Sequence, residues 1–334
     1  MSVESRLDYA VAELSDGSLV KTPFWKLNSG ADGESFLITA VQHGNEVQGA
    51  EVIRRFRQIC ERELKKGTVY LVPFANIPAL RHRRSHISLK AEQPYAEHEG
   101  HNMNRTWPGD SEGNDTERVA WSLHEAVVQH CTRCLDLHSW SRFTATATLA
   151  RHGHEISSEM AMASAIRFVH WSHAASSPEA KVSTITTLFN DSDRGAICIE
   201  LAPQWVIREK EVAQGLRAAC NMARLFGMMD GEPELLEGPV VSVTEDNEDQ
   251  RHSVQAPCSG LFAENGLETS DYVEKGQKLG HIISDEDLST VEIAAPASGY
   301  LWRYGCHREH SDVRLPDMHP YAAVGDGLAT VAVP

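Results

Sequence analysis

The chain has 334 residues and a formal net charge of −16. A single hydrophobic core stops growing at about 250 to 300 residues, so we expect one large domain and a smaller second one. Nucleic-acid backbones are bound mainly through clustered Lys and Arg, so this acidic chain is not expected to bind nucleic acid. An acidic surface also repels anionic substrates at long range, and a site for an organic acid would therefore need arginines of its own.

The segment "MSVESRLDYAVAEL" lacks the basic start and apolar core of a signal peptide, and no apolar run approaches the roughly 18 residues that span a bilayer. The seven cysteines are irregularly spaced, which is typical of reduced thiols. Cys131 and Cys134 form a lone CxxC among apolar residues, and we interpret them as buried thiols. These features predict a cytoplasmic protein that does not associate with membranes.

Apolar runs of strand length alternate with stretches of helical spacing over the first two thirds of the chain. Strands are expected at 35–42, 68–75, 134–138 and 195–202, and helices at 46–67, 114–130 and 208–229. Asn114, Asp115 and Thr116 can cap the second helix. Such alternation predicts an α/β sheet with helices on both faces, whose ligand site lies at the carboxyl ends of its strands.

The composition changes near residue 230, where "DGEPELLEGPV" forms a linker rich in Pro, Gly and Glu. No long helical pattern follows, and short β-like runs recur between glycines. The stretch "APCSGLF" (256–262) returns as "APASGYL" (295–301), which suggests two similar half-units of a small β-sandwich or barrel. We therefore predict a large α/β domain over residues 1–230 and a smaller β-rich domain over residues 231–334.

Side chains able to bind a metal or move a proton stand at the ends of three expected strands. His43 follows the first strand and Glu46 begins the next helix, while His138 and Glu200 stand at or near the ends of two later strands. Each alone has an ordinary structural explanation, but ligands of α/β sheets gather at the carboxyl ends of the strands. Two imidazoles and one carboxylate are the ligand set of a catalytic zinc, with the fourth position left for water.

Two neighbouring residues support this metal hypothesis. Gly44 allows a sharp backbone turn between His43 and Glu46, so that both side chains can reach one ion. Asp136 stands two residues before His138, on the same side of that strand, where it could orient the histidine from behind. The sequence therefore predicts a metal centre at the carboxyl edge of the sheet.

Four segments appear in an order that resembles the succinylglutamate desuccinylase and aspartoacylase family. They are "VQHGNE" (41–46), "NMNRTWPG" (102–109), "DLH" (136–138) and "CIEL" (198–201). That family is similar in fold to the zinc carboxypeptidases. The resemblance covers roughly residues 30 to 230, and it implies a zinc carboxypeptidase-like mixed sheet flanked by helices that forms a catalytic domain.

Carried over to this chain, the resemblance implies roles for the residues at the strand ends. His43, Glu46 and His138 would bind one zinc ion per chain. Glu200 would be the general base for the attacking water. The reaction implied is hydrolysis of a small acyl amide.

The resemblance also assigns residues to the substrate. Asn104 and Arg105 match a pair that binds the substrate carboxylate, and the planar fork of Arg suits that group. An arginine near the segment "NIPALRHRRSH" is expected to stabilise the oxyanion. Arg84 is the first candidate and Arg83 the second, with Arg81 also in range.

The loop over residues 85–101 precedes this pair and is longer than the family pattern, so we expect it to shape or cover the substrate pocket. Its histidines, His86, His98 and His101, could approach the metal, but we favour the interpretation that they are exposed. The cluster "RHGHE" (151–155) follows the strand of His138 and is a candidate lining of the same pocket.

Residues 271–301 resemble biotinyl and lipoyl carrier domains. Those domains place a modified lysine at a hairpin tip, where this sequence has Leu288. We therefore expect a lipoyl-like barrel or sandwich without the modification.

These expectations describe a zinc-dependent hydrolase that cleaves the amide bond of an N-acyl amino acid, or of a similar small acyl amide with a free carboxylate. A metallocarboxypeptidase acting on a peptide or peptide-like substrate stays an alternative, because the same ligand geometry serves both reactions. A noncatalytic zinc-containing binding protein is a second alternative, although a binder would have no need of the general base Glu200. The expected partner is a small carboxylate-bearing substrate, and a homo-oligomer stays open.

Overall fold

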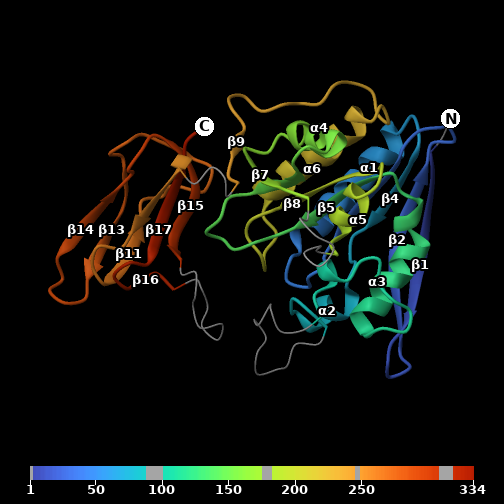
Figure 1. Cartoon of the computed structure of the whole chain (residues 1–334), viewed down its shortest axis with the longest axis horizontal. Coiled ribbons are helices and arrows are strands. Elements are labelled where there is room, and N and C mark those ends of the chain that lie inside the picture. Colours follow the sequence, from blue (N-terminus) through green and yellow to red (C-terminus); the bar gives the residue numbers. More distant parts are fainter. Residues whose placement is uncertain (1–2, 88–100, 175–182, 245–248, 308–318) are drawn as a thin grey trace.

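The structure is a computed structural model that describes residues 3–87, 101–174, 183–244, 249–307 and 319–334. Within these residues a nine-stranded mixed sheet forms the larger part of the molecule, in the order β1-β2-β4-β3-β5-β8-β6-β7-β9 (Figure 1). Its strands are β1 (Glu4–Glu13), β2 (Leu19–Asn28), β3 (Ser35–Ala40), β4 (Thr68–Val72), β5 (Arg133–His138), β6 (Ala147–Arg151), β7 (Phe168–Ser172), β8 (Gly195–Glu200) and β9 (Val241–Ser242). This sheet confirms the predicted α/β class.

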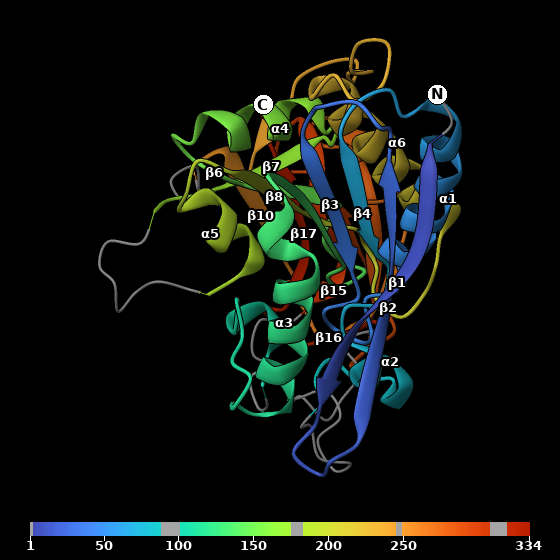
Figure 2. The same ribbon diagram turned by 90° about the vertical axis from the view of Figure 1, so that its right-hand side faces the viewer.

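Helices cover both faces of the sheet, as the sequence predicts (Figure 2). One face carries α1 (Gln48–Glu63), α4 (Glu155–Ala163) and α6 (Glu209–Leu225), and the other carries α3 (Asp115–Ala126) and α5 (Ile185–Asn190). Shorter helices are α2 (Ile77–His82), η1 (Met103–Arg105) and η2 (Val128–His130). Phe36 and Ile38 of β3 pack with the first group of helices and Leu37 with the second. This alternation buries both faces, which explains why the central strands are continuous apolar runs.

Most of the predicted elements are longer than those observed, and two of them illustrate the difference. The strand predicted over 35–42 stops at Ala40, because Val41 has a left-handed φ of 59° that takes the chain out of the sheet. The helix predicted over 46–67 covers only Gln48–Glu63. The differences lie at element ends, where the apolar pattern continues past the last backbone hydrogen bond.

The N-terminal end of α3 is capped as predicted. The Asn114 side chain accepts hydrogen bonds from the backbone N–H groups of Thr116 and Glu117, and the Glu117 carboxylate accepts one from the Asn114 N–H. The hairpin of β1 and β2 at the edge of the sheet is missing from the predicted elements. Most side chains of β1 are exposed, so this strand lacks the apolar run that marks the central strands.

Strand direction reverses within the sheet. β3, β5 and β8 are parallel neighbours, so their carboxyl ends lie at one edge. β6 runs antiparallel to β8 but parallel to β7, which is parallel to β9. The carboxyl ends of β6, β7 and β9 therefore lie at the opposite edge. Ligands of α/β sheets gather at carboxyl ends of strands, so each edge is a place to look for a site.

The described C-terminal residues form two four-stranded antiparallel sheets, ordered β10-β17-β15-β12 and β14-β13-β11-β16 (Figure 1). Their strands are β10 (Arg251–Gln255), β11 (Gly260–Glu264), β12 (Tyr272–Val273), β13 (Lys278–Ser284), β14 (Thr290–Ala294), β15 (Gly299–His307), β16 (Tyr321–Ala322) and β17 (Gly327–Ala332). Side chains of both sheets, such as Phe262 and Leu301, share one hydrophobic cluster. The predicted all-β module is thus confirmed. The closer likeness to carrier domains stays a prediction, and Leu288 lies in the β13–β14 loop with 80% of its surface exposed.

The sandwich and the large sheet are joined by backbone pairing and an apolar contact. The Ala145 N–H donates to the Trp302 carbonyl at 2.9 Å, and the Tyr304 N–H donates to the Phe143 carbonyl at 2.8 Å. The Trp302 ring packs against Phe168, with ring centroids 5.0 Å apart. The loop that follows β5 is therefore held by β15 of the sandwich.

The predicted boundary at residue 230 falls before the last strand of the large sheet. β9 lies beyond it and pairs with β7. The division into residues 1–230 and 231–334 stays a prediction, with β9 belonging structurally to the first part.

The lone CxxC is a pair of buried free thiols, as interpreted from the sequence. Burial raises the pKa of Cys131 well above its ordinary value, so this thiol stays protonated and is a poor metal ligand. Among the helices in the described part of the chain, none is long and apolar enough to cross a lipid bilayer.

Candidate metal centre and active site

The edge formed by the carboxyl ends of β3, β5 and β8 carries a cluster of ionisable side chains. His43 follows β3, Glu46 precedes α1, and His138 is the last residue of β5. Glu200 is the last residue of β8 and pairs with His138 in the register of the two strands. The parallel order of these strands therefore brings together residues that lie far apart in the sequence.

The Glu46 carboxylate lies between the two imidazoles. Its Oε1 is 2.8 Å from His43 Nδ1 and its Oε2 is 2.8 Å from His138 Nδ1. The Ser139 N–H donates to the same Oε2 at 3.1 Å. His43, Glu46 and His138 each offer a ligand atom, and these atoms lie within 4.8 Å of one another. The described residues thus contain a His–Glu–His group that could hold a metal ion.

The outer nitrogens of the imidazoles contact oxygen atoms. His43 Nε2 is 2.9 Å from Asn102 Oδ1, and His138 Nε2 is 2.8 Å from Asp136 Oδ2. Asn102 Oδ1 also accepts the Asn104 N–H at 2.8 Å, which fixes the orientation of the Asn102 amide. Because these oxygens only accept, each imidazole donates from Nε2, and each Nδ1, which faces the equally acceptor-only Glu46 carboxylate, carries a proton that a bound metal ion would replace. Nε2 of each imidazole is thus held by an outer oxygen and Nδ1 is left for the ion, so the donor set fits zinc.

A second possible set, Asp136, His138 and Cys198, shares His138 with the first. Burial raises the pKa of Cys198 well above its ordinary value, and the charge of Glu200 raises it further. A protonated thiol does not bind a metal, so the set around Glu46 is the better candidate.

The two glutamates of the cluster have pKa values shifted in opposite directions. Burial alone would raise the pKa of Glu46, but His43 and His138 outweigh it and hold this pKa well below its usual range. Burial, followed by the charge of Glu46, raises the pKa of Glu200 to about 8. Glu46 is thus a permanent anion suited to a cation, whereas Glu200 can exchange a proton near neutral pH.

Glu200 has room for a further partner. Its Oε2 is buried and has no hydrogen-bond partner among the residues that the structure describes. Buried polar atoms are nearly always paired in folded proteins, so this oxygen is a natural contact for a water or a substrate group.

The residues assigned to the substrate lie at different distances from the metal cluster and differ in exposure. Asn104 lies at the site, with Nδ2 3.3 Å from His138 Nε2. Arg105 is exposed, and its guanidinium donates to the Asn104 carbonyl at 2.6 Å. Arg83 is exposed at the end of α2, and Arg84 is half-buried. Of these side chains, the structure brings only that of Asn104 next to the metal cluster through a described contact.

Comparison with known proteins identifies the family. The model of the succinylglutamate desuccinylase/aspartoacylase catalytic domain matches residues 32–226, which is more than half of the 334-residue chain. The chain belongs to this family. The resemblance drawn from four short segments is thereby confirmed.

A curated relative and solved structures are similar to this family member. It is 24% identical over 279 residues to the N-alpha-acetyl-L-2,4-diaminobutyric acid deacetylase of Halomonas elongata, covering 81% of this chain and 77% of that protein. Its fold matches a succinylglutamate desuccinylase/aspartoacylase from Rhodobacter sphaeroides, with a TM-score of 0.68 at 21% identity and coverage of 98% and 95%. The product-bound ectoine utilization protein EutE (DoeB) of Ruegeria pomeroyi gives a TM-score of 0.68 at 19% identity, with coverage of 100% and 96%. These matches extend over both parts of the chain, so the predicted fold class is confirmed.

One histidine of the loop before the Asn-Arg pair is buried, contrary to its interpretation from the sequence. His86 has 1% of its surface exposed, and its ring centroid is 5.3 Å from that of His43. His101 is exposed as predicted, and His98 lies outside the described residues. In this family member His86 thus packs directly beside a proposed metal ligand.

Gly44 serves the site in a way that the sequence did not indicate. The backbone turns sharply at Gly44 as expected, with the Glu46 N–H donating to the His43 carbonyl at 3.1 Å, but Gly44 has no positive φ. A Cβ at this position would lie 2.3 Å from the Ala79 carbonyl carbon and 2.4 Å from the Arg84 carbonyl oxygen. Glycine is therefore needed here because the backbone between the two ligands passes against the end of α2.

Two residues that contact the cluster are absent from the predicted site. Asn102 bonds to His43, and Gln42 bonds to Asp136 behind His138. Asn102 belongs to the segment "NMNRTWPG" that also contains Asn104 and Arg105, so its position in that segment could have indicated a role at the site. In the sequence, the only feature that distinguishes Gln42 is that it is a polar residue at the end of an apolar run.

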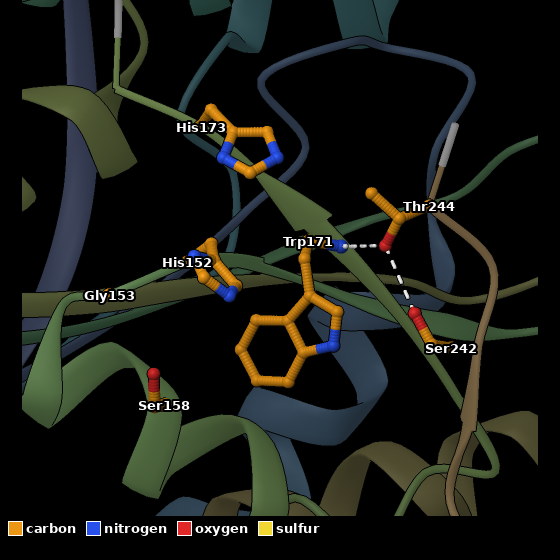
Figure 3. Close-up of a pocket in the computed structure, with 7 residues that line it drawn as sticks. All are labelled: His152, Gly153, Ser158, Trp171, His173, Ser242 and Thr244. Carbon is orange, nitrogen blue, oxygen red and sulfur yellow. Dashed lines mark hydrogen bonds between the residues drawn. The ribbon is translucent and has the colours of Figure 1, made fainter. Parts of the chain in front are cut away.

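A pocket lies at the other edge of the sheet (Figure 3). It is lined by His152, Gly153, Ser158, Trp171, His173, Ser242 and Thr244. Figure 3 shows the His152 imidazole between that of His173 and the Trp171 indole; the ring centroids of His173 and Trp171 are 5.2 Å and 6.3 Å from that of His152. Most lining residues lie at or just beyond the carboxyl ends of β6, β7 and β9, and Ser158 lies on α4, so the cluster "RHGHE" (151–155) lines a pocket at the edge opposite His138. No carboxylate is found among the described lining residues, so this pocket lacks the ligand set and the acid/base pair that the metal cluster offers.

Proposed function

We propose that this protein is a zinc-dependent hydrolase that removes the acyl group from an N-acyl amino acid, or from a similar small acyl amide with a free carboxylate. The observation that carries the proposal is the pair of Nδ1 atoms directed at Glu46, with Glu200 in register beside His138. The names desuccinylase, aspartoacylase and deacetylase, borne by its family and its relative, support the same reaction class. We also propose a cytoplasmic location, in keeping with the free cysteines of the chain.

His43, Glu46 and His138 would hold the ion, one per chain, and Asp136 would orient His138. Zinc bound there would lower the pKa of a water and polarise the scissile carbonyl. Glu200 would accept the proton of the attacking water and pass it to the leaving amine, a role that suits its raised pKa.

Substrate recognition would come from the segment around η1 and from the end of α2. Asn104 would bind the substrate carboxylate together with Arg105, once the guanidinium leaves the Asn104 carbonyl. Arg84, with Arg83 as the second candidate, would stabilise the oxyanion. Arg84 is favoured because it is half-buried and its backbone contacts the Gly44 segment.

The proposal is tested by Glu200→Gln, which keeps the volume of the side chain and removes the base. We expect about one zinc per chain in the parent and in this variant, with turnover of N-acetyl or N-succinyl amino acids lower by about two to four orders of magnitude in the variant. His138→Ala is the matched control and should lose the metal.

Metal analysis and product analysis separate the outcomes. Loss of zinc in Glu200→Gln would make Glu200 a ligand, and full turnover would remove it from the mechanism. Release of a free acid supports the deacylase, whereas release of a terminal amino acid from a peptide would support the metallocarboxypeptidase instead. A parent that binds zinc and acyl amino acids but hydrolyses none of them would be the noncatalytic binding protein.

A further inference from the structure

Gln42 is fully buried directly behind the proposed metal ligand His138. Its Nε2 lies 2.8 Å and 2.9 Å from the two carboxylate oxygens of Asp136. Its Oε1 accepts the indole N–H of Trp107 at 2.7 Å. Asp136 in turn contacts His138 Nε2 at 2.8 Å. A continuous row of buried hydrogen bonds therefore runs from Trp107 to the imidazole.

The chemistry of the partners fixes the orientation of the Gln42 amide. An indole N–H can only donate, so the atom facing Trp107 must be the amide oxygen. The NH₂ group must then face Asp136, whose carboxylate can only accept. No other arrangement of the amide satisfies both neighbours. Trp107 thus decides which end of Gln42 meets Asp136.

The backbone just before Gln42 is held in a costly conformation. Val41 has a φ of 59°, a region that β-branched residues rarely adopt and that costs on the order of 1 to 3 kcal/mol. The Asn76 N–H donates to the Val41 carbonyl at 2.9 Å, and the Asn76 side chain donates to the Gln42 carbonyl at 3.1 Å. Such strain persists only where the surroundings enforce it, which indicates that the direction of the Gln42 side chain matters.

We propose that Gln42, oriented by Trp107, is a positioning residue that holds the Asp136 carboxylate against His138 Nε2 and so keeps Nδ1 of His138 directed at the metal. The inference rests on the proposed zinc centre. Asp136 alone could rotate toward other donors; two hydrogen bonds from one amide fix both of its oxygens. Removing a residue that orients a metal ligand through a hydrogen bond typically lowers metal affinity by about 10- to 100-fold.

The test is the zinc affinity of metal-free protein, measured by competition with a chromophoric chelator. Gln42→Met keeps the length of the side chain and removes the amide, and we expect zinc affinity to fall by about 10- to 100-fold. Trp107→Phe keeps an aromatic ring and removes only the donor that orients the amide. We expect a smaller loss in the same direction, and this variant decides the question if Gln42→Met does not fold.

Asn221→Leu is the matched control, because Asn221 is also a fully buried amide, located on α6 away from the metal cluster and bonded to the Ala163 and Glu234 carbonyls. It should lower the melting temperature and leave zinc affinity as in the parent. Unchanged zinc affinity in Gln42→Met, or an equal loss in Asn221→Leu, would overturn the inference while leaving the metal centre intact. A parent that binds no zinc would overturn the metal centre and the inference together.

Discussion

Arg105 contacts its own neighbour in the structure, because its guanidinium donates to the Asn104 carbonyl. If it binds the substrate carboxylate, Arg105→Ala should lower kcat/KM for an N-acyl amino acid far more than for the corresponding carboxamide. A charge-assisted hydrogen bond is worth about 1.5 to 3 kcal/mol, so the difference between the two substrates should be roughly 10- to 150-fold. Steady-state kinetics on the substrate pair measure it.

Arg105→Lys serves as the control for charge alone. It keeps the positive charge but not the planar fork, and we expect an intermediate loss on the acid substrate. Equal losses on acid and carboxamide in Arg105→Ala would show that Arg105 only supports the Asn104 backbone.

At the scale of elements, the segment between β3 and α1 is held in place by its contact with α2. Gly44→Ala would push a methyl group into the Ala79 and Arg84 carbonyls and force the segment away. We expect at least a roughly 10-fold loss of zinc affinity, because His43 and Glu46 flank this position, and a free energy of unfolding lower by about 1 to 3 kcal/mol. Metal titration and urea unfolding measure the two effects.

Gly17→Ala is the matched control, since Gly17 has a φ of +80° and no atom lies within 4 Å of the place where a Cβ would stand. This variant should cost some stability through backbone strain and leave zinc affinity unchanged. Zinc affinity in Gly44→Ala equal to that of the parent would show that close backbone approach does not position the ligands.

The elements that could be predicted are those whose signal is local. β5 and β8 are buried on both faces, so their apolar runs marked them, and the polar residues His138 and Glu200 at their ends marked the edge of the sheet. Gln42 and Trp107 stand 65 residues apart, and only the folded chain shows that they are bonded. His86 was missed for a similar reason, because its burial depends on packing against His43 and not on any periodic pattern.

At the scale of the whole molecule, the contact between the large sheet and the sandwich centres on Trp302. Its ring packs against Phe168 and Trp140, and its carbonyl pairs with Ala145. Trp302→Ala should cost about 3 to 5 kcal/mol and uncouple the two parts. We expect differential scanning calorimetry to show a single transition for the parent and two for the variant.

Leu288→Ala is the control, because Leu288 is exposed on the far hairpin of the same sandwich. It should leave the calorimetric profile unchanged. A single transition in Trp302→Ala, merely shifted to lower temperature, would mean that the parts are coupled by other contacts.

The reversal of β6 gives the two ends of this strand different neighbours. Its first residue pairs with Glu200 beside the metal cluster, and its last leads into His152 in the pocket of Figure 3. A strand rises about 3.3 Å per residue, so five residues separate the two places by roughly 17 Å. A dye or a solid support coupled through a cysteine at His152 would therefore attach at the edge away from the metal cluster. The sheet itself provides an anchoring point for immobilising the protein with the metal cluster left clear.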